Sequence, residues 1–185
     1  MKSLGTTIKE ISIKDACIQH FKDISHDINN HDITYENAQA RERTQILMDI
    51  ANQQNGIVIG TGDMSELALG WATYNGDHMS MYGVNASVPK TLMQHLIRWV
   101  AKEKGNEQIA KTLLDIVGTP ISPELTPADE KGNIKQKTED LVGPYELHDF
   151  FLYNFVCNGF SPEKIFFLAQ KAFNGAYSND TIKKW

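Results

Sequence analysis

Cysteine is scarce in this chain of 185 residues: only Cys17 and Cys157 occur, far apart and without a Cys-x-x-Cys context. Two such residues predict neither a disulfide framework nor a zinc site, and they are typical of a reducing compartment. No apolar run approaches the roughly 20 residues that a membrane-spanning helix needs. The first twenty residues mix polar and apolar types, which is unlike a signal peptide. We therefore expect a cytoplasmic protein with no membrane partner.

An excess of positive charge and several common binding and catalytic signatures are also missing. The formal net charge is −5 and no basic run occurs, which disfavours a nucleic-acid partner while leaving room for a local basic pocket for one nucleotide. The chain contains no Walker A loop, no Gly-x-Ser-x-Gly elbow, no His-Glu-x-x-His and no Gly-x-Gly-x-x-Gly. Any chemistry must therefore come from a less regular pattern.

The composition that remains is that of an ordinary globular domain, with 41% hydrophobic and 22% charged residues. A chain of this length can bury a core of its own. Four prolines (120, 123, 127 and 144) punctuate a polar stretch in the middle of the sequence. We therefore divide the chain into an α/β part at 1–118, a Pro-rich loop at 119–144 and a helical tail at 145–185.

Hydrophobic spacing predicts strands and helices in alternation over the first part. We expect a strand at 6–13, a helix at 14–27, and a longer helix from Thr34, its N-cap, to Asn55-Gly56. The β-branched triplet at 57–59 predicts a short strand that is buried on both faces of a parallel sheet. Further helices are expected from Pro89 to Gly105, at 107–117, and in the tail from Tyr145, Ser161-Pro162 and Ser178.

The segment that follows the 57–59 strand holds the first candidate site residues. Thr61 lies where ligands bind in open α/β sheets, at the carboxyl end of a strand, although it could instead bond its own backbone in a turn. Asp63 and Glu66 have the spacing of a capping box. The alternative is that Glu66 binds Mg²⁺, which prefers carboxylate and phosphate oxygens.

Four more residues have both a binding interpretation and a structural one. Lys90 lies in a first helical turn, which is unfavourable for the helix dipole unless a phosphate lies between, but exposed lysines are common. Arg41 could clamp a phosphate or form a surface ion pair. Trp71 and Tyr74 could stack on a heteroaromatic ring or belong to the core; the Gly- and Asn-punctuated run around them is typical of a binding loop.

Three stretches resemble the synthetase domain of glutamine-dependent NAD⁺ synthetases. These are ENAQARERTQILMDIAN, GIVIGTGDMSELALGWATYNGDHMSMYGVNASVPKTL and KTEDLVGPYELHDFFLYNF, and the resemblance runs from Thr34 to about Phe173. It implies an adenine-nucleotide α-hydrolase-like, Rossmann-like fold with a parallel sheet that is incomplete here. It also implies an ATP-dependent carbon–nitrogen ligase. In that family ATP adenylates deamido-NAD⁺, and ammonia from a glutaminase domain then displaces AMP.

The resemblance also assigns roles to residues. Positions that contact ATP in the family are matched by Thr61, Lys90 and Thr138. The Mg²⁺ carboxylate is matched by Glu66, which also counts among the deamido-NAD⁺ positions together with Asn37, Arg41, Trp71, Ala72, Thr73, Tyr74 and Asp77. We expect no catalytic residue in the strict sense in this chain, because the family's Ser-Gly-Gly-x-Asp-Ser pyrophosphate loop is not found in it.

Two functions from different classes follow. The first is part of an NAD⁺ synthetase site, inactive as an isolated chain, that other sequence completes and that forms homo-oligomers as family members do. The second is a non-catalytic nucleotide-binding or dimerisation module. A GMP or asparagine synthetase has no support in the run GTGDMSELALGW.

Overall fold

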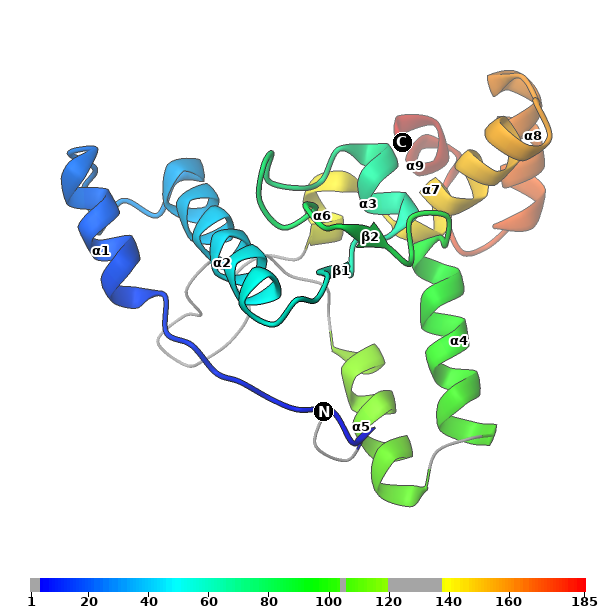
Figure 1. Ribbon diagram of the computed structural model, residues 1–185. Coiled ribbons are helices and arrows are strands. Elements are labelled where there is room, and N and C mark those ends of the chain that lie inside the picture. The colour runs from blue at the N-terminus through cyan, green and yellow to red at the C-terminus, as the bar shows by residue number, and fades with distance from the viewer. Residues whose placement is uncertain (1–3, 104–105, 120–137) are drawn as a thin grey trace.

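The computed structural model describes residues 4–103, 106–119 and 138–185, and it is mostly helical (Figure 1). In the first part, α1 (Lys14–Asp23) and α2 (Ile33–Gln53) precede β1 (Ile59–Gly60), α3 (Met64–Leu69), β2 (Tyr82–Gly83), α4 (Lys90–Glu103) and α5 (Glu107–Gly118). In the second part, α6 (Thr138–Val142), α7 (Tyr145–Leu152), the π-helix η2 (Tyr153–Cys157), α8 (Pro162–Ala172) and α9 (Asn179–Lys184) follow.

The sheet is small and parallel. Ile59 pairs with Tyr82 and Gly60 with Gly83, so the predicted parallel arrangement is confirmed. The predicted burial on both faces is wrong, because Ile57 is 63% and Ile59 50% exposed. Two strands present few neighbours to either face, so the apolar triplet is only partly covered within the described residues. The expected strand at 6–13 is also wrong: the segment is extended but pairs with no described strand (Figure 1).

The two N-terminal helices confirm their predictions with shifted ends. α1 stops at Asp23 rather than at residue 27. Ser25, shortly after the end of the helix, takes a left-handed conformation with φ of 56°. The N-cap of α2 is Asp32 and not Thr34, since an Asp32 carboxylate oxygen accepts hydrogen bonds from the Thr34 and Tyr35 amides at 2.9 and 3.1 Å. A carboxylate caps the first turn at least as well as a hydroxyl. α2 ends before Asn55, with φ of 50°, as expected.

The later elements follow the predicted order with two additions. α4 and α5 occupy the expected ranges, while Gly105 and residues 120–137 lie outside the described part. The expected loop at 119–144 contains a short helix, α6, which the sequence analysis missed because of the prolines in this stretch. The tail is helical as predicted, with Ser161 and Ser178 as N-caps of α8 and α9. α7 continues without a break into the π-helix η2, which no sequence pattern indicated.

Buried apolar residues form two hydrophobic clusters within the described residues. The first joins α1 to α2 through Cys17, Phe21 and Ala38, and the Phe21 and Tyr35 rings stack with centroids 5.4 Å apart. The second joins α7, α8 and α9 through Leu147, Ala169 and Ile182, surrounded by partly buried aromatic side chains. The helices α3, α4 and α7 contact one another beside the second cluster (Figure 1).

Candidate functional site

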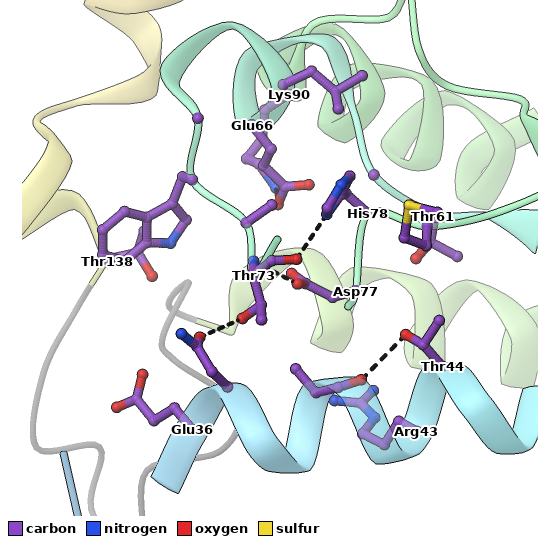
Figure 2. Close-up of a pocket in the computed structure, with 18 of the residues that line it drawn as sticks. Glu36, Arg43, Thr44, Thr61, Glu66, Thr73, Asp77, His78, Lys90 and Thr138 are labelled. Atoms are coloured by element: carbon purple, nitrogen blue, oxygen red, sulfur yellow. Dashed lines mark hydrogen bonds and ion pairs between the residues drawn. The ribbon is translucent and has the colours of Figure 1, made fainter. Parts of the chain in front are cut away.

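A cavity of about 890 Å³ opens between α2, the segment after β1, the loop that follows α3, and the starts of α4 and α7. It brings together most of the residues that the sequence singled out: Asn37, Thr61, Glu66, Trp71, Ala72, Thr73, Asp77, Lys90 and Thr138 all line it (Figure 2). Arg41 and Tyr74 are not among the lining residues. The cavity is thus a single space shared by both predicted groups of site residues.

The capping box that the sequence predicted at the start of α3 is present. The Asp63 carboxylate accepts a hydrogen bond from the Glu66 amide at 2.9 Å, and the Glu66 carboxylate accepts one from the Asp63 amide at 3.3 Å. Capping uses one oxygen of each carboxylate, so the second oxygen is available for another partner. The structural interpretation of Asp63 and Glu66 as capping residues is therefore confirmed.

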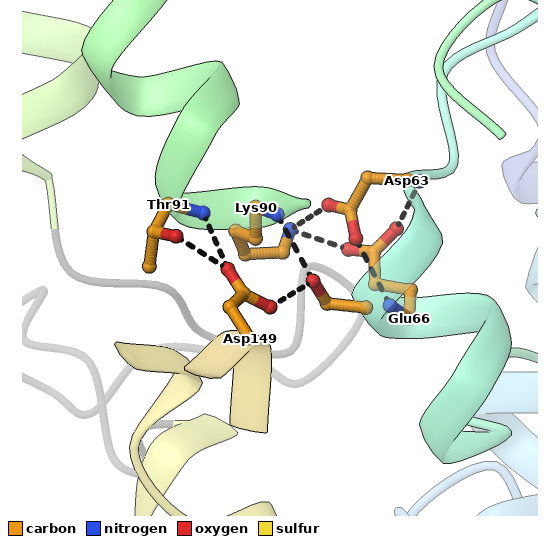
Figure 3. Close-up of polar contacts among 6 residues, drawn as sticks. Asp63, Glu66, Lys90, Thr91 and Asp149 are labelled. Carbon is orange, nitrogen blue, oxygen red and sulfur yellow. Dashed lines mark hydrogen bonds and ion pairs between the residues drawn. The ribbon is translucent and has the colours of Figure 1, made fainter. Parts of the chain in front are cut away.

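That second oxygen on each carboxylate contacts Lys90. The Lys90 ammonium lies 2.8 Å from Asp63 Oδ2 and 2.7 Å from Glu66 Oε1, at the first residue of α4 (Figure 3). Burial acts to lower the pKa of Lys90, but the hydrogen bonds with Asp63 and Glu66 outweigh it, so the pKa lies above its usual value. The three groups together carry one net negative charge. Lys90 is therefore a charged, preorganised cation on the cavity wall beside two carboxylates.

The backbone start of α4 is capped from other helices, which the sequence analysis missed. The Lys90 amide donates to Ser65 Oγ at 2.9 Å, and the Thr91 amide and hydroxyl donate to Asp149 Oδ2 at 2.8 and 2.6 Å. The Ser65 hydroxyl donates in turn to Asp149 Oδ1, so α3, α4 and α7 meet in one hydrogen-bond network (Figure 3). Asp149 is 6% exposed and Ser65 is fully buried. No pattern in the sequence indicated that Ser65 and Asp149 would cap another helix.

The other side of the cavity joins α2 to the loop after α3. The Thr73 hydroxyl donates to the Asn37 side-chain oxygen at 2.8 Å, and the Thr73 amide donates to the Asp77 carboxylate at 2.7 Å (Figure 2). Arg41 donates from Nε to the Tyr74 carbonyl at 3.1 Å. Arg41 and Asn37 thus hold the loop against α2, which places Asn37, Thr73 and Asp77 around one part of the cavity.

The aromatic side chains of this loop are accessible. Tyr74 is 82% exposed, so the alternative that it belongs to the core is wrong, and Trp71 is 37% exposed on the cavity wall. Thr61 is exposed at the end of β1, and its hydroxyl makes no hydrogen bond to any part of the chain that the structure describes. The alternative that Thr61 bonds its own backbone therefore has no support.

Two buried residues complete the wall on the side of α6 and α7. Thr138, one of the predicted residues, is 1% exposed at the start of α6. Tyr145, the first residue of α7, is 2% exposed and was missed by the sequence analysis, where it read only as the start of a helix. Burial, together with the carboxylates nearby, raises the pKa of Tyr145 to about 12.

Within residues 4–103, 106–119 and 138–185, no group of three or more His, Cys, Asp and Glu side chains forms a metal-binding cluster. Mg²⁺ typically uses one or two protein carboxylates with substrate phosphates and water, so such a cluster is not required for a magnesium site. No helix in the same ranges is both long and apolar enough to cross a bilayer.

Comparison with known proteins shows the family to which this chain belongs. The sequence model of the family described as NAD synthase matches residues 1–168. The chain therefore belongs to the NAD synthase family. It is 47% identical over 100% of its length to the glutamine-dependent NAD(+) synthetase of Mycobacterium leprae, and 50% identical over 95% to that of Mycobacterium bovis. It spans only 27% and 26% of the lengths of those relatives.

Solved structures show the same fold. A glutamine-dependent NAD(+) synthetase from Cytophaga hutchinsonii superposes on all of this chain with a TM-score of 0.69 and 22% identity, and 28% of its own length is covered. An NMN synthetase from Francisella tularensis covers 92% of this chain with a TM-score of 0.62 and 24% identity, over 64% of its own length. The small parallel sheet with its helices is thus a part of the NAD synthetase fold.

Proposed function

We propose that this chain forms part of the active site of a glutamine-dependent NAD⁺ synthetase with an adenine-nucleotide α-hydrolase-like fold. In the reaction a carboxylate oxygen of deamido-NAD⁺ attacks the α-phosphorus of ATP, and pyrophosphate leaves. Ammonia, released from glutamine by a glutaminase domain, then attacks the acyl carbon and AMP leaves. The observation that carries the proposal is the single cavity that gathers the residues expected to bind ATP and those expected to bind deamido-NAD⁺.

The ATP side of the cavity is the wall around Lys90. Lys90 is held at the start of α4 with a full positive charge, and Thr61 and Thr138 also line the cavity. A fixed cation of this kind stabilises the negative charge that develops on a departing pyrophosphate. A Mg²⁺ ion held by Glu66 would supply further neutralisation of the phosphates. Since Lys90 with Asp63 and Glu66 carries one net negative charge, the triphosphate would enter with Mg²⁺, which offsets that charge.

The deamido-NAD⁺ side is the wall formed by α2 and the loop after α3. Asn37, Thr73 and Asp77 offer donors and acceptors there, and Trp71 offers an aromatic face. Trp71 could stack on the nicotinate ring, which is planar and heteroaromatic. Arg41, through Tyr74, keeps the loop in position rather than reaching into the cavity.

Calorimetric titration of the chain with Mg²⁺-ATP and, separately, with deamido-NAD⁺ tests the proposal. We expect both ligands to bind, and NAD⁺ formation by the isolated chain to be absent. Lys90→Gln should weaken ATP about tenfold or more, because a charge-assisted hydrogen bond is lost, and Asn37→Ala should weaken deamido-NAD⁺ instead. Lys164→Gln, on the distant α8, is the matched control and should change neither affinity. Absence of binding by both ligands would contradict the proposal.

Self-association is a second proposal, because apolar side chains gather on η2 and α8. Tyr153, Phe155, Val156 and Phe167 are each between 57% and 71% exposed. Exposed apolar patches of this kind mark interfaces. Light scattering coupled to gel filtration should give a dimer mass for the chain, and Phe155→Ser should shift it to the monomer; a monomer mass for the unchanged chain would contradict the proposal.

A further inference from the structure

The side chain of Tyr145 has an unsatisfied polar group on the cavity wall. Its hydroxyl is buried and has no hydrogen-bond partner among the described residues, although the side chain lines the cavity. Buried polar groups are almost always paired, and an unpaired one costs free energy. The hydroxyl of Tyr145 therefore needs an explanation that the fold alone does not supply.

The position of the ring is fixed by its surroundings. The Tyr145 amide donates to Glu139 Oε1 at 3.0 Å, which fixes the first residue of α7. The Lys90 ammonium lies 5.2 Å from the centre of the ring, on the wall assigned to ATP. The phenol is thus held beside the cation that would receive phosphate, and it has little freedom to turn elsewhere.

The chemistry of the hydroxyl decides the kind of partner. With its pKa raised to about 12 by burial, it remains protonated near neutral pH and can donate a hydrogen bond. Nearby carboxylates already have partners: Asp63 and Glu66 bind Lys90 and the amides of their capping box, and Glu139 accepts from the Tyr145 amide. Because Lys90 with Asp63 and Glu66 carries one net negative charge, a phosphate oxygen would arrive here as part of the magnesium complex of ATP, in which Mg²⁺ offsets that charge.

We propose that Tyr145 is a ligand-binding residue whose hydroxyl donates a hydrogen bond to a phosphoryl oxygen of ATP in this cavity. The inference rests on the proposed function and adds a residue to it. The buried hydroxyl is held in place for the ligand, and its cost in the ligand-free chain is recovered when the phosphate arrives. Tyr145→Phe should therefore weaken ATP binding and stabilise the ligand-free protein, two effects of opposite sign.

The experiment compares Tyr145→Phe with Tyr177→Phe in the full chain. The Tyr177 hydroxyl donates to Glu146 Oε2 at 3.2 Å near the surface, so it is satisfied and lies outside the cavity lining. Titration calorimetry gives the dissociation constants of Mg²⁺-ATP and of adenosine, and thermal unfolding without ligand gives Tm. We expect ATP to bind Tyr145→Phe about tenfold more weakly, adenosine to bind unchanged, and Tm to rise by about 2–4 °C. Tyr177→Phe should change neither affinity and should not raise Tm.

Each other result has a distinct meaning. Unchanged ATP affinity in Tyr145→Phe, as a bridging water would give, overturns the inference while the proposed function stands. If Tyr145→Phe lost as much affinity for adenosine as for ATP, the hydroxyl would not bind a phosphoryl oxygen. If its Tm fell, the hydroxyl would not be unpaired in the ligand-free protein. Failure of the unchanged chain to bind ATP overturns the proposed function and this inference together.

Discussion

Asp149 is the residue whose replacement should disturb the site most without touching a ligand. Its Oδ2 accepts hydrogen bonds from the Thr91 amide and hydroxyl, and its Oδ1 accepts one from Ser65. The side chain is 6% exposed, so water cannot replace these partners. Asp149→Asn preserves the shape but turns one acceptor oxygen into an NH₂ donor, which then faces a donor from α3 or α4.

The magnitude follows from the bonds that are lost. Whichever way the amide turns, at least one charge-assisted hydrogen bond, worth roughly 1.5–3 kcal/mol, disappears, and the donor it served is left buried and unpaired. We expect the free energy of unfolding to fall by about 2–4 kcal/mol, a large part of the roughly 5–15 kcal/mol of a typical domain. For a chain of this size Tm should fall by roughly 5–15 °C.

Urea denaturation followed by circular dichroism measures the effect. Asp115→Asn, at an exposed position on α5, is the matched control and should stay within about 0.5 kcal/mol of the unchanged chain. If Asp149→Asn also stayed within that range, the network would not hold α3, α4 and α7 together, and the reasoning from buried hydrogen bonds would be refuted.

Three further predictions concern a turn and two ionised groups. Gly143→Ala should lower the free energy of unfolding by about 2 kcal/mol or more in urea denaturation, because φ is 87° and the new Cβ would meet the Trp185 ring; an unchanged midpoint would contradict this. The pKa of Asp32 is lowered in the folded protein, chiefly by its hydrogen bond from the Tyr35 amide. The unchanged chain should therefore be more stable than Asp32→Asn above pH 3.8, and this difference should vanish as pH falls through the lowered pKa of the folded protein. The pKa of Lys90 is raised above 10.5 in the folded protein, so the unchanged chain should be more stable than Lys90→Met below pH 10.5. This difference should vanish as pH rises through the raised pKa of the folded protein. Midpoints of urea denaturation measured against pH test the predictions for Asp32 and for Lys90.

Local patterns predicted the helices of this chain well, because their signals lie close together in sequence. Helices begin at Ser161-Pro162 and Ser178 as predicted, with Ser161 and Ser178 as N-caps, and Asp63 with Glu66 forms the expected capping box. The error at the start of α2 came from choosing between two capping residues two positions apart, Asp32 and Thr34. Such choices depend on backbone geometry that a pattern does not encode.

Features that depend on contacts between distant parts of the sequence were predicted less well. The strand expected at 6–13 has the right alternation but no described partner, since pairing depends on segments distant in sequence. Asp149 and Tyr145 were missed as site residues because their roles arise only when α7 packs against the starts of α3 and α4. By contrast, sequence patterns raised Thr61, Glu66 and Lys90 as possible ligand contacts, the family resemblance assigned roles to the candidates from Asn37 to Thr138, and the cavity brings most of them together.

The most direct test of the central claim is where ATP binds. Amide chemical shifts of the ¹⁵N-labelled chain, recorded during titration with Mg²⁺-ATP, report the location residue by residue. We predict that the largest shifts fall at Thr61, Glu66, Lys90, Thr138 and Tyr145, around the cavity, while Cys17 and its neighbours in the α1–α2 cluster stay unchanged. Shifts confined to α1, or no shifts at saturating ATP, would contradict the assignment of this cavity as part of an NAD⁺ synthetase site.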